Sequence, residues 1–174
     1  MVPTAIDDLI KLAEPLKGVK KPKAKDWKRI EDEKELSFPN DYKEFVDVYG
    51  ACVLLNCLGI HSPFTKPSLF DHHRQIRKLA GSVAQFFPDS PGLLECGSDE
   101  YSSLLMWKAD ASVPPDDWTM LYTQSNFIYS EDHECGLVEY LVKWLRGEIA
   151  PEWLPTLEEL QARGPVVKAL EFTK

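Results

Sequence analysis

Residues 36–50 read LSFPNDYKEFVDVYG, and this stretch decides the fold because it contains a complete helix with both of its ends. Pro39 suits the first turn of a helix, since its φ angle is fixed near the helical value and it has no amide proton to leave unpaired. The residues that then follow at helical spacing and form one apolar face are Tyr42, Phe45, Val46 and Tyr49. Gly50 is placed to end the helix in the left-handed conformation. The stretch therefore predicts an amphipathic helix that begins at Pro39 and ends before Gly50.

Two more helices are expected on the N-terminal side of this stretch. Thr4 can cap the first helix by accepting a hydrogen bond from the amide of Asp7. The apolar stripe of this helix consists of Ile6, Leu9, Ile10 and Ala13. Pro15 and Gly18 end it. A second, short helix is predicted from Trp27 to about Lys34.

On the C-terminal side, the apolar run from Cys52 to Ile60 is interrupted by Asn56 and Gly59 and predicts one strand or a bent pair of strands. Ser68 and Asp71 then give a capping signal for another amphipathic helix. Its apolar stripe is Ile76, Leu79, Ala80, Val83, Phe86 and Phe87, so we expect this helix to continue to near Pro88.

From Leu93 the apolar period changes from that of a helix to that of strands. Four short strands separated by Gly, Ser, Pro and Asp are expected at Leu93–Cys96, Leu104–Lys108, Trp118–Thr123 and Phe127–Tyr129. Such spacing is typical of an antiparallel meander. The elements expected after it are a helix at Leu137–Leu145, a helix from the Thr156/Glu159 capping box to Gly164-Pro165, and a terminal strand at Val166–Phe172. This order predicts an α+β fold, with a single, mostly antiparallel sheet and helices packed against it.

Composition places the chain among globular proteins that need neither disulfides nor a metal to fold. It has 174 residues, 44% of them hydrophobic, which suits one domain with a full core. Its four cysteines are typical of reduced thiols in the cytosol, and we expect them to be buried and structural. The sequence shows neither a signal peptide nor an apolar run long enough to span a membrane. We therefore expect a soluble, cytoplasmic protein that does not bind membranes.

Charge is distributed unevenly along the chain, although the net charge is −8. Residues 1–29 hold eight Lys/Arg and four Asp/Glu, which gives a net charge of +4. Residues 89–159 hold three Lys/Arg and fifteen Asp/Glu, which gives a net charge of −12. A negative field repels nucleic acids and attracts a cationic partner, although acidity can also serve solubility alone. We interpret the lysine-rich segment 17–28 as a solvated linker rather than a nucleic-acid contact.

The residue patterns of common catalytic and cofactor sites are missing from the sequence. It contains no GxGxxG, GxxxxGK[ST] or GxSxG motif, which argues against nucleotide binding and a serine nucleophile elbow. The histidines are His61, His72, His73 and His133, and no two of them have the i, i+4 spacing of a zinc helix. Cys52 and Cys57 lack a second pair of cysteines at knuckle spacing. We expect no catalytic residue, no metal and no cofactor.

Acidic residues in the predicted turns of the C-terminal half form the candidate binding site. They could act as paired carboxylates in acid–base or two-metal chemistry, but solvated acids are common in turns. Loops on a rigid sheet are frequent sites of recognition, and aromatic anchors within an acidic rim suit a cationic protein partner. The predicted partner-binding residues are Asp99, Glu100, Tyr101, Asp116, Asp117, Glu131, Asp132 and Glu134. Trp107 and Tyr122, at alternating strand positions, are interpreted as core residues.

Three blocks of the sequence resemble the SUKH superfamily, in its Smi/Knr-like branch. The opening motif corresponds to Trp27-x-x-Ile30-Glu31 followed by 36–50. The central sheet of the family is similar to residues 93–107 and Trp118-Thr119, and its closing helix is similar to residues 137–148. The resemblance predicts a single SUKH-like domain over 1–174. Its parts would be an N-terminal helix with a basic linker (1–26), a core (27–148) and a C-terminal helical extension (149–174).

This resemblance implies a non-catalytic protein-binding domain. Many bacterial members look like immunity proteins that neutralise nuclease- or deaminase-type toxins, whereas fungal relatives act as regulatory scaffolds. We therefore expect an immunity protein that blocks a basic toxin domain by direct binding, and the acidic segment 89–159 is compatible with fast capture of such a partner. A regulatory scaffold for an endogenous partner and a metal-assisted hydrolase using the loop carboxylates are the alternatives.

Overall fold

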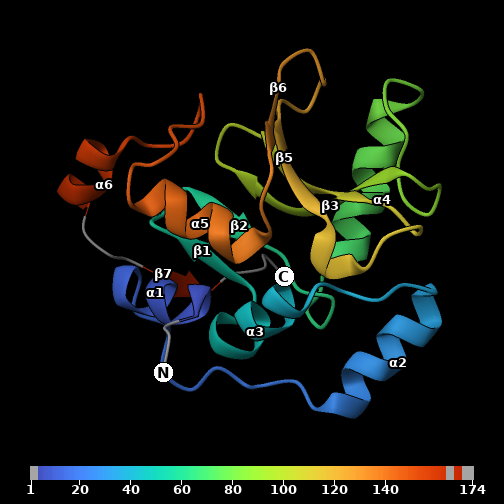
Figure 1. Cartoon of the computed structure of the whole chain (residues 1–174), viewed down its shortest axis with the longest axis horizontal. Coiled ribbons are helices and arrows are strands. Elements are labelled where there is room, and N and C mark those ends of the chain that lie inside the picture. Colours follow the sequence, from blue (N-terminus) through green and yellow to red (C-terminus); the bar gives the residue numbers. More distant parts are fainter. Residues whose placement is uncertain (1–3, 164–166, 170–174) are drawn as a thin grey trace.

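The computed structural model describes residues 4–163 and 167–169. The helices are α1 (Ala5–Leu12), α2 (Ala24–Lys34), α3 (Asn40–Tyr49), α4 (Leu69–Ala80), α5 (Leu137–Leu145), α6 (Leu157–Arg163) and the short 3-10 helix η1 (Pro115–Asp117). The strands are β1 (Cys52–Leu54), β2 (Leu58–Ile60), β3 (Gly92–Asp99), β4 (Leu104–Ala109), β5 (Thr119–Thr123), β6 (Ser130–His133) and β7 (Val167–Ala169). Figure 1 shows their arrangement.

These strands form one antiparallel sheet in the order β6-β5-β4-β3-β2-β1-β7. Strands β1 to β6 follow one another along the chain as a meander, and β7 joins the far edge by pairing with β1. The expected α+β class, with a single antiparallel sheet and helices packed around it, is confirmed.

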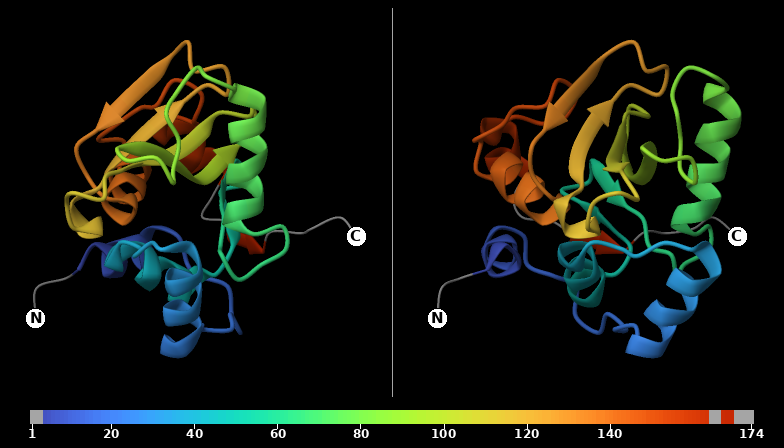
Figure 2. Two further views of the ribbon diagram at one scale, coloured as in Figure 1. Left: turned by 90° about the vertical axis from the view of Figure 1, so that its right-hand side faces the viewer. Right: turned by 45° about the vertical axis from the view of Figure 1, so that its right-hand side comes forward.

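Helices cover both faces of the sheet. Successive side chains along a strand point to opposite faces, and here both faces carry apolar side chains that the helices bury. Met106 and Leu121 lie on the face that packs with Ala80 of α4. Trp107 and Tyr122 point to the other face, into the larger core that α1, α3 and α5 close. Figure 2 shows α4 on one side of the sheet and α5 on the other. Both aromatic side chains are fully buried, as predicted.

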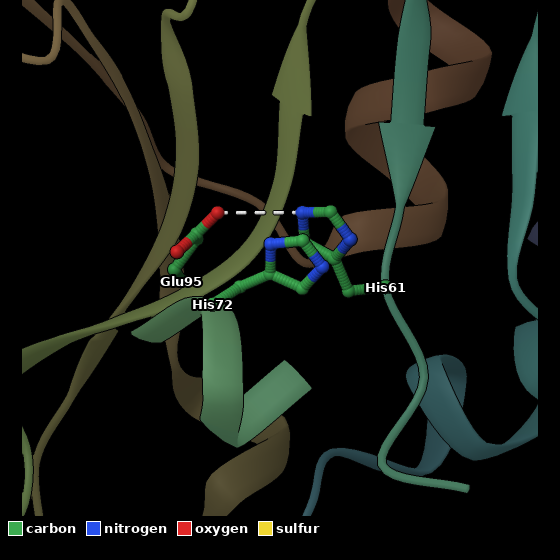
Figure 3. A group of neighbouring side chains, drawn as sticks. All are labelled: His61, His72 and Glu95. Atoms are coloured by element: carbon green, nitrogen blue, oxygen red, sulfur yellow. Dashed lines mark ion pairs between the residues drawn. The ribbon is translucent and has the colours of Figure 1, made fainter. Parts of the chain in front are cut away.

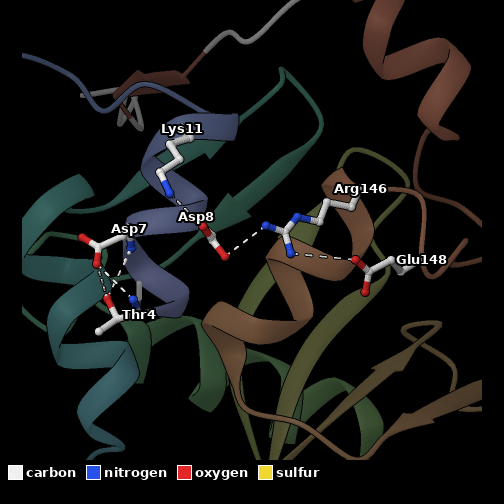
Figure 4. A network of polar contacts seen from close by, with 6 residues as sticks. All are labelled: Thr4, Asp7, Asp8, Lys11, Arg146 and Glu148. Atoms are coloured by element: carbon white, nitrogen blue, oxygen red, sulfur yellow. Dashed lines mark hydrogen bonds and ion pairs between the residues drawn. The ribbon is translucent and has the colours of Figure 1, made fainter. Parts of the chain in front are cut away.

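The N-terminal helix α1 packs on this larger core. Its cap is the predicted one, because Thr4 and Asp7 form a reciprocal capping box. Leu9 is fully buried, and Tyr49 of α3 donates a hydrogen bond from its hydroxyl to the carbonyl of Ala13 at 2.6 Å. Arg146, just after α5, forms an ion pair with Asp8 at 3.0 Å (Figure 4).

The helix predicted to continue to Pro88 ends at Ala80, which corrects that expectation. Gly81 follows with a φ of 60°, a conformation that suits glycine and ends the helix. The chain then turns back, and Phe86 pairs with Leu93 at the start of β3. Phe86 still packs into the core beside α4. Its apolar side chain is therefore buried by the returning loop and not by a longer helix.

The strand predicted at Phe127–Tyr129 is wrong, because these residues form the turn that precedes β6. Phe127 has a φ of 59° and donates a backbone hydrogen bond to Gln124 at 2.9 Å. The actual strand, β6, reads Ser-Glu-Asp-His and lies at the edge of the sheet. Its side chains are polar because they are in contact with solvent, so it has no alternation of apolar residues by which to predict it. The run Cys52–Ile60 is the bent pair, β1 and β2, which turns at Leu55 and Asn56.

Predictions for the last residues are only partly covered by the structure. The capping box of Thr156 and Glu159 is present at the start of α6. The predicted end of this helix at Gly164-Pro165 lies outside the described residues. Of the strand predicted at Val166–Phe172, β7 confirms the part from Val167 to Ala169, and the rest lies outside the described residues.

Candidate functional site

The β3–β4 and β5–β6 turns lie side by side at one end of the sheet. Leu104 pairs with Thr123, and Thr123 pairs with Ser130, so residues 100–103 and 124–129 must be neighbours. We call these two segments the turn end. The large apolar or aromatic side chains exposed there are Tyr101, Ile128 and Tyr129, with exposed fractions of 66%, 84% and 40%. Exposed large apolar side chains on neighbouring turns are candidates for a contact surface.

Asp99 supports the turn end from within, because its side chain is only 9% exposed. Its Oδ1 accepts hydrogen bonds from the backbone amides of Tyr101 at 2.8 Å and Ser103 at 2.7 Å. Its Oδ2 accepts a hydrogen bond from the hydroxyl of Tyr122. Burial, together with this hydrogen bond to Asp99, raises the pKa of Tyr122, so the phenol remains a donor. Asp99 therefore holds the turn that presents Tyr101, and its carboxylate is engaged inside the protein.

Asp116 and Asp117 lie at the opposite end of the sheet. They belong to η1 between β4 and β5, a strand length of about 17 Å from the turn end. Asp116 accepts hydrogen bonds from Asn40 at the start of α3, from the backbone amide and from Nδ2, both at 2.6 Å. Glu134, which follows β6, is exposed at this same end. The eight predicted residues are therefore divided between the two ends of the sheet and β6.

Glu131 and Asp132 lie on the edge strand β6 and point to opposite faces. Asp132 forms an ion pair with Lys108 of β4 at 2.6 Å. Glu131 accepts a hydrogen bond from the backbone amide of Glu152 at 2.9 Å. Beside it, the rings of Tyr129 and Trp153 pack edge to face with centroids 4.9 Å apart. Glu131 is thus continuous with the turn end, on the side of Tyr129.

Among the residues that the structure describes, the lysines of the N-terminal segment form no ion pair with the acids of the strands. Their ion pairs join Lys11 to Asp8, Lys21 to Asp47 and Lys28 to Asp32. The linker instead lines a cavity of about 780 Å³ together with α2 and the loop before α4. The cationic side chains of this cavity belong to Lys20, Lys21, Lys23, Lys25, Arg29 and Lys66. In Figure 1 the linker and α2 lie at the bottom and the β5–β6 turn at the top, so the lysines of the linker are remote from that turn.

Three ionisable side chains meet in the interior between the sheet and α4. They are His61, which follows β2, His72 of α4 and Glu95 of β3, and each offers a ligand atom within 4.8 Å of the other two (Figure 3). The Nε2 atom of His61 lies 3.3 Å from Oε1 of Glu95. The two imidazole rings stack with centroids 3.9 Å apart. Burial, with a contribution from His61, lowers the pKa of His72.

Sequence reasoning missed this cluster because it tested only spacing along the chain. Its members are separated by 11 and 23 residues and come together through β2–β3 pairing and the packing of α4 on β3. The available signal was Glu95 itself, a carboxylate within the apolar run Leu93–Cys96. A charged residue at such a position requires a partner when it is buried.

The comparison with protein families identifies the chain. Residues 3–88, about half of its length, match the family model SUKH_5, described as SMI1-KNR4 cell-wall. The chain belongs to the SUKH superfamily. None of the curated proteins and none of the solved structures that were searched matches it.

The region matched in this SUKH domain runs from the N-terminal helix to the loop before β3. It includes the motif at 36–50 and also α1, whereas the turn end lies beyond it. The SUKH family is generally non-enzymatic. Within the part of the SUKH domain that the structure describes, no helix has the length and apolar character required to cross a membrane.

Proposed function

We propose that this SUKH domain is a non-catalytic, cytoplasmic immunity protein that neutralises a basic toxin domain by binding it at the turn end. The observation that carries the proposal is the group of exposed side chains Tyr101, Ile128 and Tyr129 on two adjacent turns. Tyrosine is enriched among residues that dominate binding energy, because it buries a large area at low entropic cost.

The turn end is suited to tight binding because it is held in place before a partner arrives. Asp99 fixes the backbone around Tyr101 through two amide hydrogen bonds. Trp153 supports Tyr129 from the side. Ordering of flexible side chains and loops costs free energy on association, so a surface that is already ordered binds more tightly.

Charge supports a cationic partner. Glu100 is exposed beside Tyr101, Glu131 lies next to Tyr129, and residues 89–159 carry a balance of −12. A negative field around an apolar centre accelerates encounter with a basic protein and repels nucleic acid. Asp116, Asp117 and Glu134 contribute to this field from the other end of the sheet, rather than by contact in the same interface.

The alternatives fit the geometry less well. A hydrolase that uses the loop carboxylates needs them available for chemistry. Asp99 is instead bound to backbone amides, Asp116 to Asn40 and Asp132 to Lys108. A regulatory scaffold would use the same exposed side chains on an endogenous partner. The identity of the protein that binds therefore separates the two remaining functions.

The test uses basic nuclease- or deaminase-type toxin domains encoded next to this gene. Each is mixed with the full chain and examined by size-exclusion chromatography and titration calorimetry, and co-expression tests relief of its toxicity. We expect a 1:1 complex, and we expect the double variant Tyr101→Ala, Ile128→Ala to weaken it at least tenfold. Val113→Ala is the matched control, because Val113 is an exposed apolar residue of the β4–β5 loop.

Two results would contradict the proposal. If no neighbouring toxin domain binds or is neutralised, the immunity function is wrong. If a complex forms and the double variant binds as tightly as the unaltered protein, the turn end is not the contact surface.

A further inference from the structure

We propose that His61, His72 and Glu95 form a binding site for a transition-metal ion, with Zn²⁺ as the ion best suited to this donor set. The site would join three separate parts of the fold, namely the end of β2, the first half of α4 and the middle of β3. It lies in the interior rather than at the turn end, so the inference is independent of the proposed function.

Backbone pairing brings two of the ligands together. The amide of His61 donates a hydrogen bond to the carbonyl of Cys96 at 2.8 Å, which continues the β2–β3 ladder by one residue. His61 is thereby placed beside Glu95, and their side-chain atoms Nε2 and Oε1 lie 3.3 Å apart. Helix α4 packs against β3 and brings His72 to the same point.

The spacing of the donor atoms is close to that of a coordinated ion. Zn²⁺ binds nitrogen at about 2.0–2.1 Å in tetrahedral geometry, which places its ligand atoms about 3.3 Å apart. The His61–Glu95 pair already has this separation. All three ligand atoms lie within 4.8 Å of one another, and binding of one ion by both histidines requires their stacked rings to tilt toward a common point.

Two buried atoms of the cluster point to a missing ligand. Glu95 is 2% exposed, and its second oxygen, Oε2, is without a hydrogen-bond partner among the described residues. The same is true, within that part of the chain, of Nε2 of His72. A buried polar atom without a hydrogen-bond partner lowers the stability of the folded protein, and an unpaired buried carboxylate lowers it further. A divalent cation would bind to both residues and compensate the carboxylate charge.

A proton shared between His61 and Glu95 is the competing explanation. It would pair Nε2 of His61 with Oε1 of Glu95, and Ser98 Oγ lies 3.4 Å from the same nitrogen. That arrangement leaves Oε2 of Glu95 and Nε2 of His72 without partners. A metal ion engages all three side chains, whereas a proton between His61 and Glu95 engages two of them.

The neighbouring histidine and cysteine are excluded as ligands by their own contacts. His73 accepts a hydrogen bond from the amide of Glu95 at Nδ1 and donates one from Nε2 to the carbonyl of Phe87 at 2.8 Å. The thiol of Cys96 donates to the carbonyl of Leu105 at 3.3 Å. His73 instead positions the backbone of Glu95.

The donor set selects the class of ion. Two imidazoles and one carboxylate are the ligands of His₂Glu zinc sites, whereas Mg²⁺ and Ca²⁺ prefer oxygen ligands. Three protein ligands leave a fourth position for water. His72 is the most exposed of the three residues, although its Nε2 atom is itself buried.

The test is metal binding by the full chain after treatment with EDTA and removal of the chelator. Calorimetric titration with ZnCl₂ is expected to show one site per chain, and CoCl₂ is expected to give the intense visible absorption of four-coordinate Co²⁺. We expect Glu95→Gln and His72→Gln each to weaken Zn²⁺ binding at least tenfold. The controls are His133→Gln, which removes a histidine outside the cluster and should bind as the unaltered protein does, and MgCl₂, which should not bind.

Thermal unfolding separates loss of a ligand from loss of the fold. Zn²⁺ should raise the Tm of the unaltered protein and of His133→Gln, but not that of His72→Gln or Glu95→Gln. If Glu95→Gln fails to fold, His72→Gln decides the question, because its position is partly exposed. The proposal is overturned if the unaltered protein shows no saturable 1:1 binding, or if the folded cluster variants bind Zn²⁺ as tightly as it does.

Discussion

Asp41 shows how one buried carboxyl group connects two helices. It lies in the first turn of α3, and its Oδ2 accepts a hydrogen bond at 3.0 Å from the amide of Val138, at the start of α5. Helix amides at this position have no partner within their own helix, so the contact caps α5. Burial nevertheless raises the pKa of Asp41 above its usual value.

The raised pKa of Asp41 predicts a defined pH dependence of stability. Between the unfolded pKa of 3.8 and the higher folded value, the native protein binds more protons, so this residue's contribution falls as pH rises. Asp41→Asn keeps an acceptor for Val138 and removes the titration. Urea unfolding of both proteins across this range measures the free energy of unfolding of the unaltered protein minus that of Asp41→Asn. We expect this difference to decrease as pH rises and then to become constant. A constant or increasing difference would contradict the prediction.

At the scale of elements, α1 provides a direct comparison between burial and charge. Leu9 is fully buried against the core, whereas the ion pair of Asp8 with Arg146 is partly exposed to solvent. Exposed ion pairs contribute little, since water and salt screen them. The attachment of α1 therefore depends mainly on its apolar face.

This comparison predicts very different effects for two substitutions. Leu9→Ala should lower the free energy of unfolding by about 2–5 kcal/mol, because it leaves a cavity in the core. Arg146→Ala should lower the urea midpoint far less than Leu9→Ala does. At high salt the midpoints of Arg146→Ala and the unaltered protein should be almost equal, because salt screens the ion pair. Chemical unfolding monitored by tryptophan fluorescence measures both. An equal loss in the two variants would mean that the ion pair, and not packing, holds α1.

At the scale of the whole molecule, the lysine-rich linker and the turn end lie in different parts of the fold. The linker, α2 and the loop before α4 line the cationic cavity, whereas the acidic residues of 89–159 are distributed over both ends of the strands. The ion pairs of the N-terminal lysines stay within their own half of the chain. The negative field of the strand half is therefore available to steer a partner.

Steering predicts a salt effect on the rate of complex formation. With a basic toxin domain as partner, the association rate constant should fall about tenfold or more as NaCl is raised from low to high concentration, because ions screen long-range attraction. The dissociation rate constant should change much less, since it depends on the apolar contacts of Tyr101 and Ile128. Stopped-flow mixing at several NaCl concentrations measures both constants. Equal changes in the two would argue against electrostatic steering.

Local patterns predicted most of the elements, and they failed where an element has no local signal. The helix at 36–50 was predictable because its apolar face and both ends lie within one short stretch. Strand β6 was missed because its residues are polar and its pairing with β5 is the only reason for its conformation. The helix α4 was predicted too long because Phe86 is buried by a returning loop, which gives the same apolar signal as a helical residue.

Some residues of the candidate site could likewise be placed from local sequence, whereas others could be placed only from the fold. Tyr101 was predicted as a partner-binding residue because a turn with neighbouring acids is recognisable in sequence, and the structure places its side chain at the surface. Asp99, two residues earlier, has the same appearance in sequence, and only the fold shows that its carboxylate binds the turn from inside. The separation of Asp116 from Glu100 likewise depends on which strands precede them.

The sequence by itself determined the α+β class, the family and the uneven charge, because these depend on residue type and on spacings within one element. Tertiary structure decided which acids share a surface and brought His61, His72 and Glu95 to one point. The physical reason is that strand pairing and helix packing join residues far apart in the chain, and a side chain's chemistry depends on the neighbours they supply. A lone glutamate in an apolar strand indicates that a partner is needed, but only the folded chain identifies it.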